Sequence, residues 1–311
     1  MPSAFITGIN GFLGQTLARV LLADGWQVGG LMRANAHRGA LGNMSGLRIS
    51  YGDLLDSSAY ADSLASYDVF FHVAAMYTHD PISIPHMRDV NGPGAALALR
   101  TALAAGVPRL VHSSTIGVIL QPQDGTLATE AAVGAPPGAS AYVQSKWAGD
   151  QAAAALAVEG ASVVIVHPVA MLGPGDWRSN SGALVKAALR GDVSRYLAGG
   201  INWCPVEDVA RGMVLAAQRG QPGRRYILGH RHGNLDAVAF LDLIANAAGY
   251  GRWRRWWKQR RARKPVAGSR PTRLTCDPSR AIAELGMPQN DLLAAARAEI
   301  AWYRQKNMIN L

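Results

Sequence analysis

Between residue 4 and about residue 167, short apolar runs alternate with longer segments of helical periodicity. Most of the runs are apolar throughout instead of alternating with polar residues, as is typical of strands that are covered on both faces. The predicted strands are Ala4–Thr7, Gln27–Met32, Leu47–Tyr51, Asp68–Val73, Arg109–Ser113 and Ser162–His167. Between the first two, Leu13–Ala23 places four apolar side chains on one helical stripe and ends before Gly25. Repeated strand–helix units predict an α/β fold with a parallel, doubly wound sheet.

Two later segments are predicted to return to the same sheet. They are a strand over Arg225–Leu228 and a helix near Glu207–Gln218, which bring the sheet to about seven strands. The excursion Pro168–Cys204 and the tail from Gly229 onward are predicted to be irregular or helical. We therefore expect residues 1–167 and 205–229 to form a Rossmann-type nucleotide-binding domain, and residues 168–204 and 230–311 to form a smaller, mostly helical substrate lobe. The stretch Gln121–Ser140, rich in Pro, Gly and Ala, predicts a long loop of the kind that often has a function.

Composition narrows the class of protein. The 311 residues are 49% hydrophobic and 17% charged, which excludes an intrinsically disordered chain. The two cysteines, Cys204 and Cys276, are too few for a disulfide framework or a thiolate zinc site. The eight histidines show no metal-ligand spacing. The first residues lack the features of a signal peptide, and no run reaches the roughly 18 apolar residues of a membrane span. We therefore expect a cytoplasmic protein without a metal site.

The formal net charge of +10 has a local origin. The segment Arg252–Lys264 contains eight basic residues and no acid, and without those eight the chain's 31 basic residues fall to 23, against 21 acidic ones. As a helix, the segment would carry Trp253, Trp256 and Trp257 on one short face. Two interpretations stay open: a solvated segment without a binding role, or a contact with an acidic carrier protein, an anionic substrate or a membrane surface. Nucleic-acid binding is not expected, because nothing else in the chain predicts a groove-reading module.

The first predicted strand runs into the sequence TGINGFLG, which leads directly into a helix. Gly8, Gly11 and Gly14 allow a tight turn and a close approach of the backbone to a pyrophosphate, which the helix N-terminus would bind. This context predicts a dinucleotide site. The second strand ends in Leu31-Met32-Arg33 without an acid, and an arginine there binds a 2′-phosphate. NADPH is therefore favoured over NADH; an Arg33 that only faces solvent is the alternative.

Candidate catalytic groups follow later in the chain. The sequence ASAYVQSKWAG places Tyr142 and Lys146 four residues apart at the start of a helix, so that both project from one face. An ammonium near a phenol lowers the tyrosine pKa from about 10 toward working pH. The fifth strand ends in HSSTIGV, where Ser114 or Thr115 brings a hydroxyl to the carboxyl edge of the sheet. The Tyr-x-x-x-Lys spacing alone is common on exposed helices, but its combination with the glycine loop and the hydroxyl at the strand end strongly indicates a site with a tyrosine general acid or base.

These motifs resemble the extended branch of the short-chain dehydrogenase/reductase superfamily, the NAD(P)-dependent epimerase/dehydratase proteins, over nearly the whole chain. TGINGFLG is similar to that branch's TGxxGFxG loop, and Val206-Glu207-Asp208-Val209-Ala210 is similar to its Val-Asp-Asp-Val-Ala helix start. The likeness is greatest to the dihydroflavonol-4-reductase-like group. Pro93 and Pro205 depart from the family pattern, and the arginine–tryptophan run replaces the family's residues between about 250 and 272. The resemblance therefore does not extend to any particular substrate.

The resemblance also implies roles for individual residues and a homodimer. The implied catalytic set is Thr115, with Ser114 as its neighbour, Tyr142 and Lys146. The implied cofactor-binding residues are Gly8, Asn10, Gly11, Phe12, Leu13, Gly14, Arg33, Asp53, Leu54, Ala74, Ala75, Lys146, His167 and Pro168.

We expect an NADPH-dependent reductase that acts on a ketone or aldehyde, with Tyr142 as the general acid. Met76, Tyr77, Met171 and Trp177 follow segments at the catalytic edge and would line an apolar pocket for an aromatic, polyketide, terpenoid or acyl substrate. Each of the four is equally compatible with simple packing. The alternatives are a nucleotide-sugar epimerase or dehydratase that retains NAD, and a protein that binds the dinucleotide without chemistry.

Overall fold

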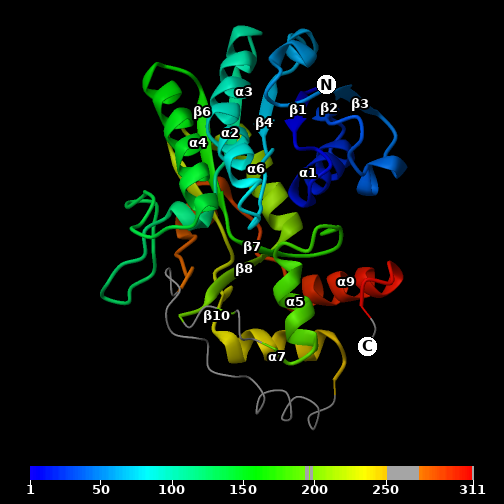
Figure 1. Ribbon diagram of the computed structural model, residues 1–311, viewed down its shortest axis with the longest axis vertical. Coiled ribbons are helices and arrows are strands. Elements are labelled where there is room, and N and C mark those ends of the chain that lie inside the picture. Colours follow the sequence, from blue (N-terminus) through cyan, green and yellow to red (C-terminus); the bar gives the residue numbers. More distant parts are fainter. Residues whose placement is uncertain (193–195, 197–198, 251–272, 310–311) are drawn as a thin grey trace.

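The computed structural model describes residues 1–192, 196, 199–250 and 273–309. Seven parallel strands form the main sheet in the order β3-β2-β1-β4-β5-β6-β9 (Figure 1). Their bounds are β1 Ser3–Thr7, β2 Gln27–Met32, β3 Leu47–Tyr51, β4 Val69–His72, β5 Arg109–Ser113, β6 Val163–Pro168 and β9 Arg225–Leu228. The predicted doubly wound α/β fold is confirmed. The strand order reverses direction between β1 and β4, and such a switch point opens a crevice for ligands at the carboxyl ends of the strands.

Helices cover both faces of this sheet, which explains why its strands are apolar throughout. Successive residues of one strand enter opposite cores: Ile6 packs in the cluster with α1 and α6, whereas Phe5 packs in the cluster with α3 and α4. Both side chains are fully buried. The helices of this part are α1 Phe12–Ala23, α2 Ile84–Asn91, α3 Pro93–Ala104, α4 Ala141–Val158 and α6 Val206–Arg219, with short turns η1 Gly39–Asn43, η2 Ser57–Ala59, η3 Ala61–Ser63 and η4 Ile116–Val118.

The smaller lobe contains a second sheet, which the sequence did not predict. Strands β7 (Ala170–Leu172), β8 (Ile201–Pro205) and β10 (Asn234–Leu235) form it in the order β10-β8-β7. The prediction that Pro168–Cys204 is irregular or helical is therefore wrong over β7 and β8, and that for the tail is wrong over β10. Strands β7 and β10 have only three and two residues, and Asn202 interrupts the apolar run of β8. The helical part is α5 Gly182–Leu189, α7 Ala237–Ala247 and α9 Leu292–Gln305, drawn below the main sheet in Figure 1.

A third hydrophobic core holds the lobe together. The indole of Trp203 on β8 is fully buried and stacks on Phe240 of α7 with ring centroids 4.5 Å apart. Its Nε1 donates a hydrogen bond of 2.7 Å to the hydroxyl of Tyr196. Part of the C-terminal tail packs elsewhere, since Cys276 and the π-helical turn η5 (Ala281–Leu285) join the core of the main sheet.

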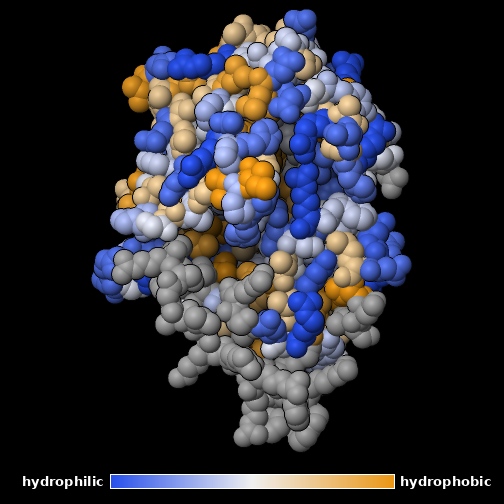
Figure 2. Space-filling model, in the orientation of Figure 1, coloured by the Kyte–Doolittle hydropathy of each residue, from blue (hydrophilic) through white to orange (hydrophobic). Residues whose placement is uncertain are grey.

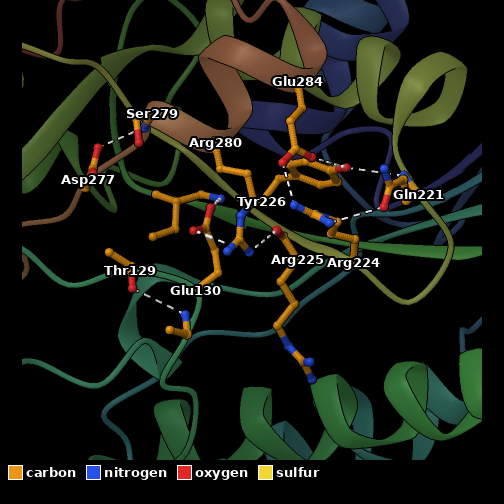
Figure 3. Close-up of polar contacts among 12 residues, drawn as sticks. Thr129, Glu130, Gln221, Arg224, Arg225, Tyr226, Asp277, Ser279, Arg280 and Glu284 are labelled. Atoms are coloured by element: carbon orange, nitrogen blue, oxygen red, sulfur yellow. Dashed lines mark hydrogen bonds and ion pairs between the residues drawn. The ribbon is translucent and has the colours of Figure 1, made fainter.

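The segment Gln121–Ser140, predicted as a loop, lies over the edge strand β9. Glu130 Oε1 accepts a hydrogen bond of 2.8 Å from the backbone N–H of Ile227 on that strand. Figure 3 shows Glu130 facing Arg280, whose guanidinium lies 3.6 Å from the Glu130 carboxylate. An exposed edge would offer unpaired backbone groups to other chains, so this loop protects the sheet.

Two sequence-based expectations concern surface and membrane contacts. The basic segment Arg252–Lys264 lies outside the described residues. Within the described ranges, no helix combines the length and the apolar character that crossing a bilayer would require.

Candidate active site

A cavity of about 750 Å³ opens at the carboxyl ends of the main-sheet strands. Its walls come from the segments after β1, β2, β3, β4, β5 and β6, from helices α2 and α4, and from the lobe at Met171 and between residues 175 and 181. On the face shown in Figure 2, the surface is hollowed between the upper, sheet-bearing part and the lower part. The predicted site residues that line the cavity are Gly8, Asn10, Gly11, Phe12, Leu13, Gly14, Arg33, Asp53, Leu54, Ala74, Ala75, Met76, Tyr77, Ser114, Thr115, Tyr142, Lys146, Pro168, Met171 and Trp177. His167 is the one predicted residue that does not line it.

The glycine loop at one end of the cavity is built around backbone contacts. Gly8 has a φ of +69°, and Gly11 N–H donates to Gly8 O at 2.9 Å. A Cβ at Gly14 would lie 2.2 Å from the same oxygen. Helix α1 starts at Phe12 without a side-chain cap and without an acid in its first turn. Its first N–H groups therefore remain for an anion, and the residues present fit the pyrophosphate of a dinucleotide.

The loop after β2 forms the adjoining wall. Arg33 is exposed and lines the cavity together with His37. Asn10 Nδ2 donates to His37 O at 3.1 Å, which ties this loop to the glycine loop. A cationic side chain beside the expected ribose position, with no acid at the end of β2, is suited to a 2′-phosphate.

The catalytic candidates meet at the centre of the cavity. Ser140 caps helix α4, since its hydroxyl accepts a hydrogen bond of 3.3 Å from Val143 N–H. This start places Tyr142 and Lys146 one turn apart on α4, and the Thr115 side chain forms a hydrogen bond with Tyr142. Thr115 lies just after β5, as the sequence predicted. The arrangement holds a phenol and a second hydroxyl at one point of the cavity.

The expectation that Lys146 lowers the Tyr142 pKa is wrong. Lys146 Nζ donates to the carbonyl of Ser113 at 2.7 Å, and burial lowers the Lys146 pKa to about 8. Burial raises the pKa of Tyr142 to about 12, and the hydrogen bond with Thr115 offsets only part of that rise. The reason is that loss of hydration outweighs a nearby cation when the phenol is enclosed. Tyr142 therefore keeps its proton at neutral pH and can donate it.

Ser114 and Thr115 differ in their surroundings. The Ser114 hydroxyl is buried at the cavity wall and has no hydrogen-bonding partner within the described residues. The Thr115 hydroxyl accepts from Gly117 N–H at 3.2 Å in addition to its contact with Tyr142. Thr115 is thus the hydroxyl that is oriented toward the tyrosine.

The residues predicted to contact substrate occupy two places. Tyr77 packs edge-on against Tyr142, with ring centroids 4.9 Å apart, and its hydroxyl pairs with His79 Nε2 at 2.8 Å. Asn91 fixes the backbone of Met76, because its side chain accepts from Met76 N–H and donates to Met76 O, both at 2.8 Å. These contacts place the segment of residues 76–77 beside the Tyr142 phenol.

Trp177 lies farther along, where the lobe meets the loop after β2. Its ring centroid is 4.9 Å from that of His37 and 4.8 Å from that of Trp302 on α9. Nearby, Gln15 of α1 donates to Gly175 O at 2.6 Å. These contacts join the lobe to the nucleotide-binding part.

Sequence reasoning missed several residues of the cavity. Arg178, Asn180 and Ser181 line it from the segment before α5. They follow no recognisable motif, and a short irregular segment gives no periodic signal. His86 of α2 also lines the wall.

His167 lies beneath the cavity instead of in its wall. It is fully buried, with Nδ1 3.2 Å from Thr115 O and Nε2 3.6 Å from Asp150 Oδ2. The ring therefore supports Thr115, one of the candidate catalytic residues, from behind. Pro168, the next residue, does reach the cavity.

Comparison with known proteins identifies the family. A profile of the NAD dependent epimerase/dehydratase family matches residues 4–229. A Synechocystis sp. protein provisionally named dihydroflavonol 4-reductase is 30% identical over 98% of this chain and 95% of its own. Sterol demethylase protein B of Methylococcus capsulatus is 28% identical over 99% and 100%. The crystal structure of gox2253 superposes with a TM-score of 0.84 at 26% identity and covers both chains completely. The chain therefore belongs to the NAD dependent epimerase/dehydratase family, the extended short-chain dehydrogenase/reductases that use NAD or NADP as reductases or epimerases.

Proposed function

We propose that this protein is an NADPH-dependent reductase that converts a ketone or aldehyde on a hydrophobic small molecule or acyl group to an alcohol. The observation that carries the proposal is the meeting of Tyr142, Thr115 and Lys146 in one cavity with the glycine loop. A reductase needs a proton donor at the carbonyl oxygen. The reverse reaction, oxidation of the alcohol, would use the same groups.

Each residue has a distinct part in this reaction. When bound, the dinucleotide supplies the hydride. Tyr142 gives its proton to the oxygen of the carbonyl, and Thr115 donates a hydrogen bond to the same oxygen. Lys146 supplies a positive charge beneath the site. The glycine loop and the start of α1 hold the pyrophosphate.

The wall beside Tyr142 suits an apolar substrate. Met76, Tyr77, Val90 and Met171 all line the cavity. The names of the two relatives, a dihydroflavonol reductase and a sterol demethylase protein, refer to hydrophobic ring compounds. A screen of aromatic, polyketide, terpenoid and acyl ketones, with NADPH consumption as the readout, tests the proposal. Absence of turnover across this whole panel would count against it.

Cofactor choice gives a sharper prediction. Arg33→Ala is expected to weaken NADPH binding about 10- to 100-fold, since it removes charge-assisted hydrogen bonds to the 2′-phosphate. NADH affinity should change little. Arg48→Ala, which removes an exposed arginine of β3 outside the cavity wall, is the matched control. Fluorescence titration of both nucleotides measures the change, and equal weakening of NADH and NADPH would contradict the role of Arg33.

The alternative within the family is a nucleotide-sugar epimerase or dehydratase that retains NAD. The name of the family, epimerase/dehydratase, favours this alternative. Arg33 at the end of β2 and the apolar wall of the cavity favour the reductase. Identification of the nucleotide that co-purifies with the protein separates the two. Retained NAD that exchanges slowly, together with tighter binding of NADH than of NADPH, would favour the epimerase or dehydratase. A protein that binds NADPH without chemistry would reduce none of the ketones in the substrate screen.

A further inference from the structure

A chain of buried polar groups lies directly behind the catalytic residues. It begins at Arg225 on the edge strand β9, whose side chain points away from Glu130 and Arg280 and toward helix α4 (Figure 3). Arg225 Nη2 lies 2.7 Å from Asp150 Oδ1. Asp150 is fully buried and sits one turn after Lys146 on the same helix. The pair therefore brings a carboxylate, together with its guanidinium partner, to the interior one helical turn from Lys146.

The second oxygen of Asp150 faces an imidazole. His167 Nδ1 contacts the carbonyl of Thr115, and because a carbonyl oxygen can only accept, Nδ1 carries the hydrogen. Nε2 of the neutral ring is then a lone pair, and it faces Asp150 Oδ2 at 3.6 Å. Neither atom has a hydrogen-bonding partner within the described residues. His167 therefore does not neutralise the carboxylate, which pairs with Arg225 and also acts on Lys146.

Titratable groups on four strands of the main sheet also face Lys146 or its partners. Three are fully buried imidazoles and one is a guanidinium: His72 of β4, His112 of β5, His167 of β6 and Arg225 of β9. Burial holds the pKa of His72 at about 3 and of His167 at about 4, and keeps the His112 pKa well below its usual range. The imidazoles are therefore neutral near pH 7. Asp150 is the anion among the groups that act on Lys146.

We propose that Asp150 is a positioning residue of the active site: its carboxylate keeps the buried Lys146 ammonium charged, and Arg225 holds that carboxylate in place. His167, which lies against the same carboxylate, contacts through Nδ1 the backbone carbonyl of Thr115, the hydroxyl residue beside Tyr142. Only the activity test of this inference rests on the proposed function; the stability test does not.

The first test is stability as a function of pH. The Lys146 pKa of about 8 lies below its ordinary value of 10.5, so the folded state releases this proton first and stability from this group rises between pH 8 and pH 10.5. Asp150→Asn lowers the folded-state pKa of Lys146 further. The stability deficit of the variant should therefore be largest near pH 6 and should shrink by pH 9, where Lys146 is neutral in both proteins. Urea denaturation at each pH measures it.

Control variants separate this role from a merely structural one. Glu159→Gln removes a carboxylate at the end of the same helix, where it pairs with Arg100 at the surface, and should leave the pH dependence unchanged. Lys146→Met removes the titrating group. In that background, the stability deficit caused by Asp150→Asn should therefore no longer depend on pH. If Asp150→Asn alone does not fold, the double variant is expected to fold because it lacks the uncompensated ammonium. The proposal would be overturned if the stability deficit of Asp150→Asn were the same from pH 6 to pH 9. It would also be overturned if Asp150→Asn did not fold and the double variant did not fold either.

The second test uses the reaction. In Asp150→Asn, the alkaline limb of the pH profile of kcat/KM should move to lower pH by about one to three pH units. In Asp150→Glu, which keeps a carboxylate, the limb should lie close to its wild-type position. A uniform loss of kcat without movement of the limb would overturn the proposed role. If no carbonyl is reduced by the wild-type protein, the proposed function fails, but the pH-dependent stability deficit would still support the role of Asp150.

Discussion

Tyr142→Phe is expected to abolish carbonyl reduction, with a fall in kcat of about 100- to 10,000-fold, the usual contribution of a positioned general acid. The phenyl ring can keep the edge-on packing against Tyr77, whose ring centroid lies 4.9 Å away. Only the hydroxyl that pairs with Thr115 is removed. Dinucleotide affinity should stay within about twofold, since the pyrophosphate is held by the glycine loop.

Steady-state rates and NADPH titration measure the two quantities separately. Tyr51→Phe is the matched control, because Tyr51 is an exposed tyrosine on β3 outside the cavity wall. Retained turnover in Tyr142→Phe would remove Tyr142 from its assigned role. A parallel loss of NADPH binding would point to a folding defect instead of lost proton donation.

Gly14→Ala is expected to cause the largest loss of both stability and nucleotide binding. Its Cβ would lie 2.2 Å from Gly8 O and 3.0 Å from Ile9 Cα. Both are backbone atoms of the glycine loop, so no side chain can move aside, and helix α1 must shift away. Overpacking of this kind costs about 1–3 kcal/mol of unfolding free energy. Because α1 also presents its N-terminus to the pyrophosphate, affinity should fall more than about 100-fold.

Gly42→Ala provides the comparison. A Cβ at Gly42 would meet no atom within 4 Å, and the φ of this residue is not positive, so its substitution should leave the unfolding free energy within about 0.5 kcal/mol. Urea denaturation and calorimetric titration of NADPH measure both variants. Equal behaviour of the two would mean that the close approach at Gly14 has no energetic consequence.

The sheet was predictable because its signals are local. Buried parallel strands are apolar throughout, and a strand boundary such as Gln27–Met32 follows directly from the run. The glycine loop and the Tyr142–Lys146 pair are also encoded by spacing within a few residues. The two-residue strand β10 has no such signal, because its pairing with Ile201 and Asn202 depends on a chain segment more than thirty residues away.

The electrostatics of the site could not be predicted from spacing. A cation four residues from a phenol suggests a lowered tyrosine pKa, but the sign depends on how completely the phenol is enclosed, which only the fold determines. The same holds for Asp150 on helix α4, because its neighbours Arg225 and His167 come from strands β9 and β6. In the sequence, Asp150 is simply an acid on a helix.

The connections between the main sheet and the lobe limit how the protein can select its substrate. A single residue, Val169, separates β6 from β7, and α6 begins at the residue after β8 ends. Hinge motions need a few free residues that absorb changes in φ and ψ. These two crossings offer hardly any, although the segments from β9 to β10 and from η5 to α9 are longer. The lobe is therefore expected to move little when substrate binds. A change of substrate specificity would then come from replacing side chains of the cavity wall, and it would not alter the rate of any conformational step in the catalytic cycle.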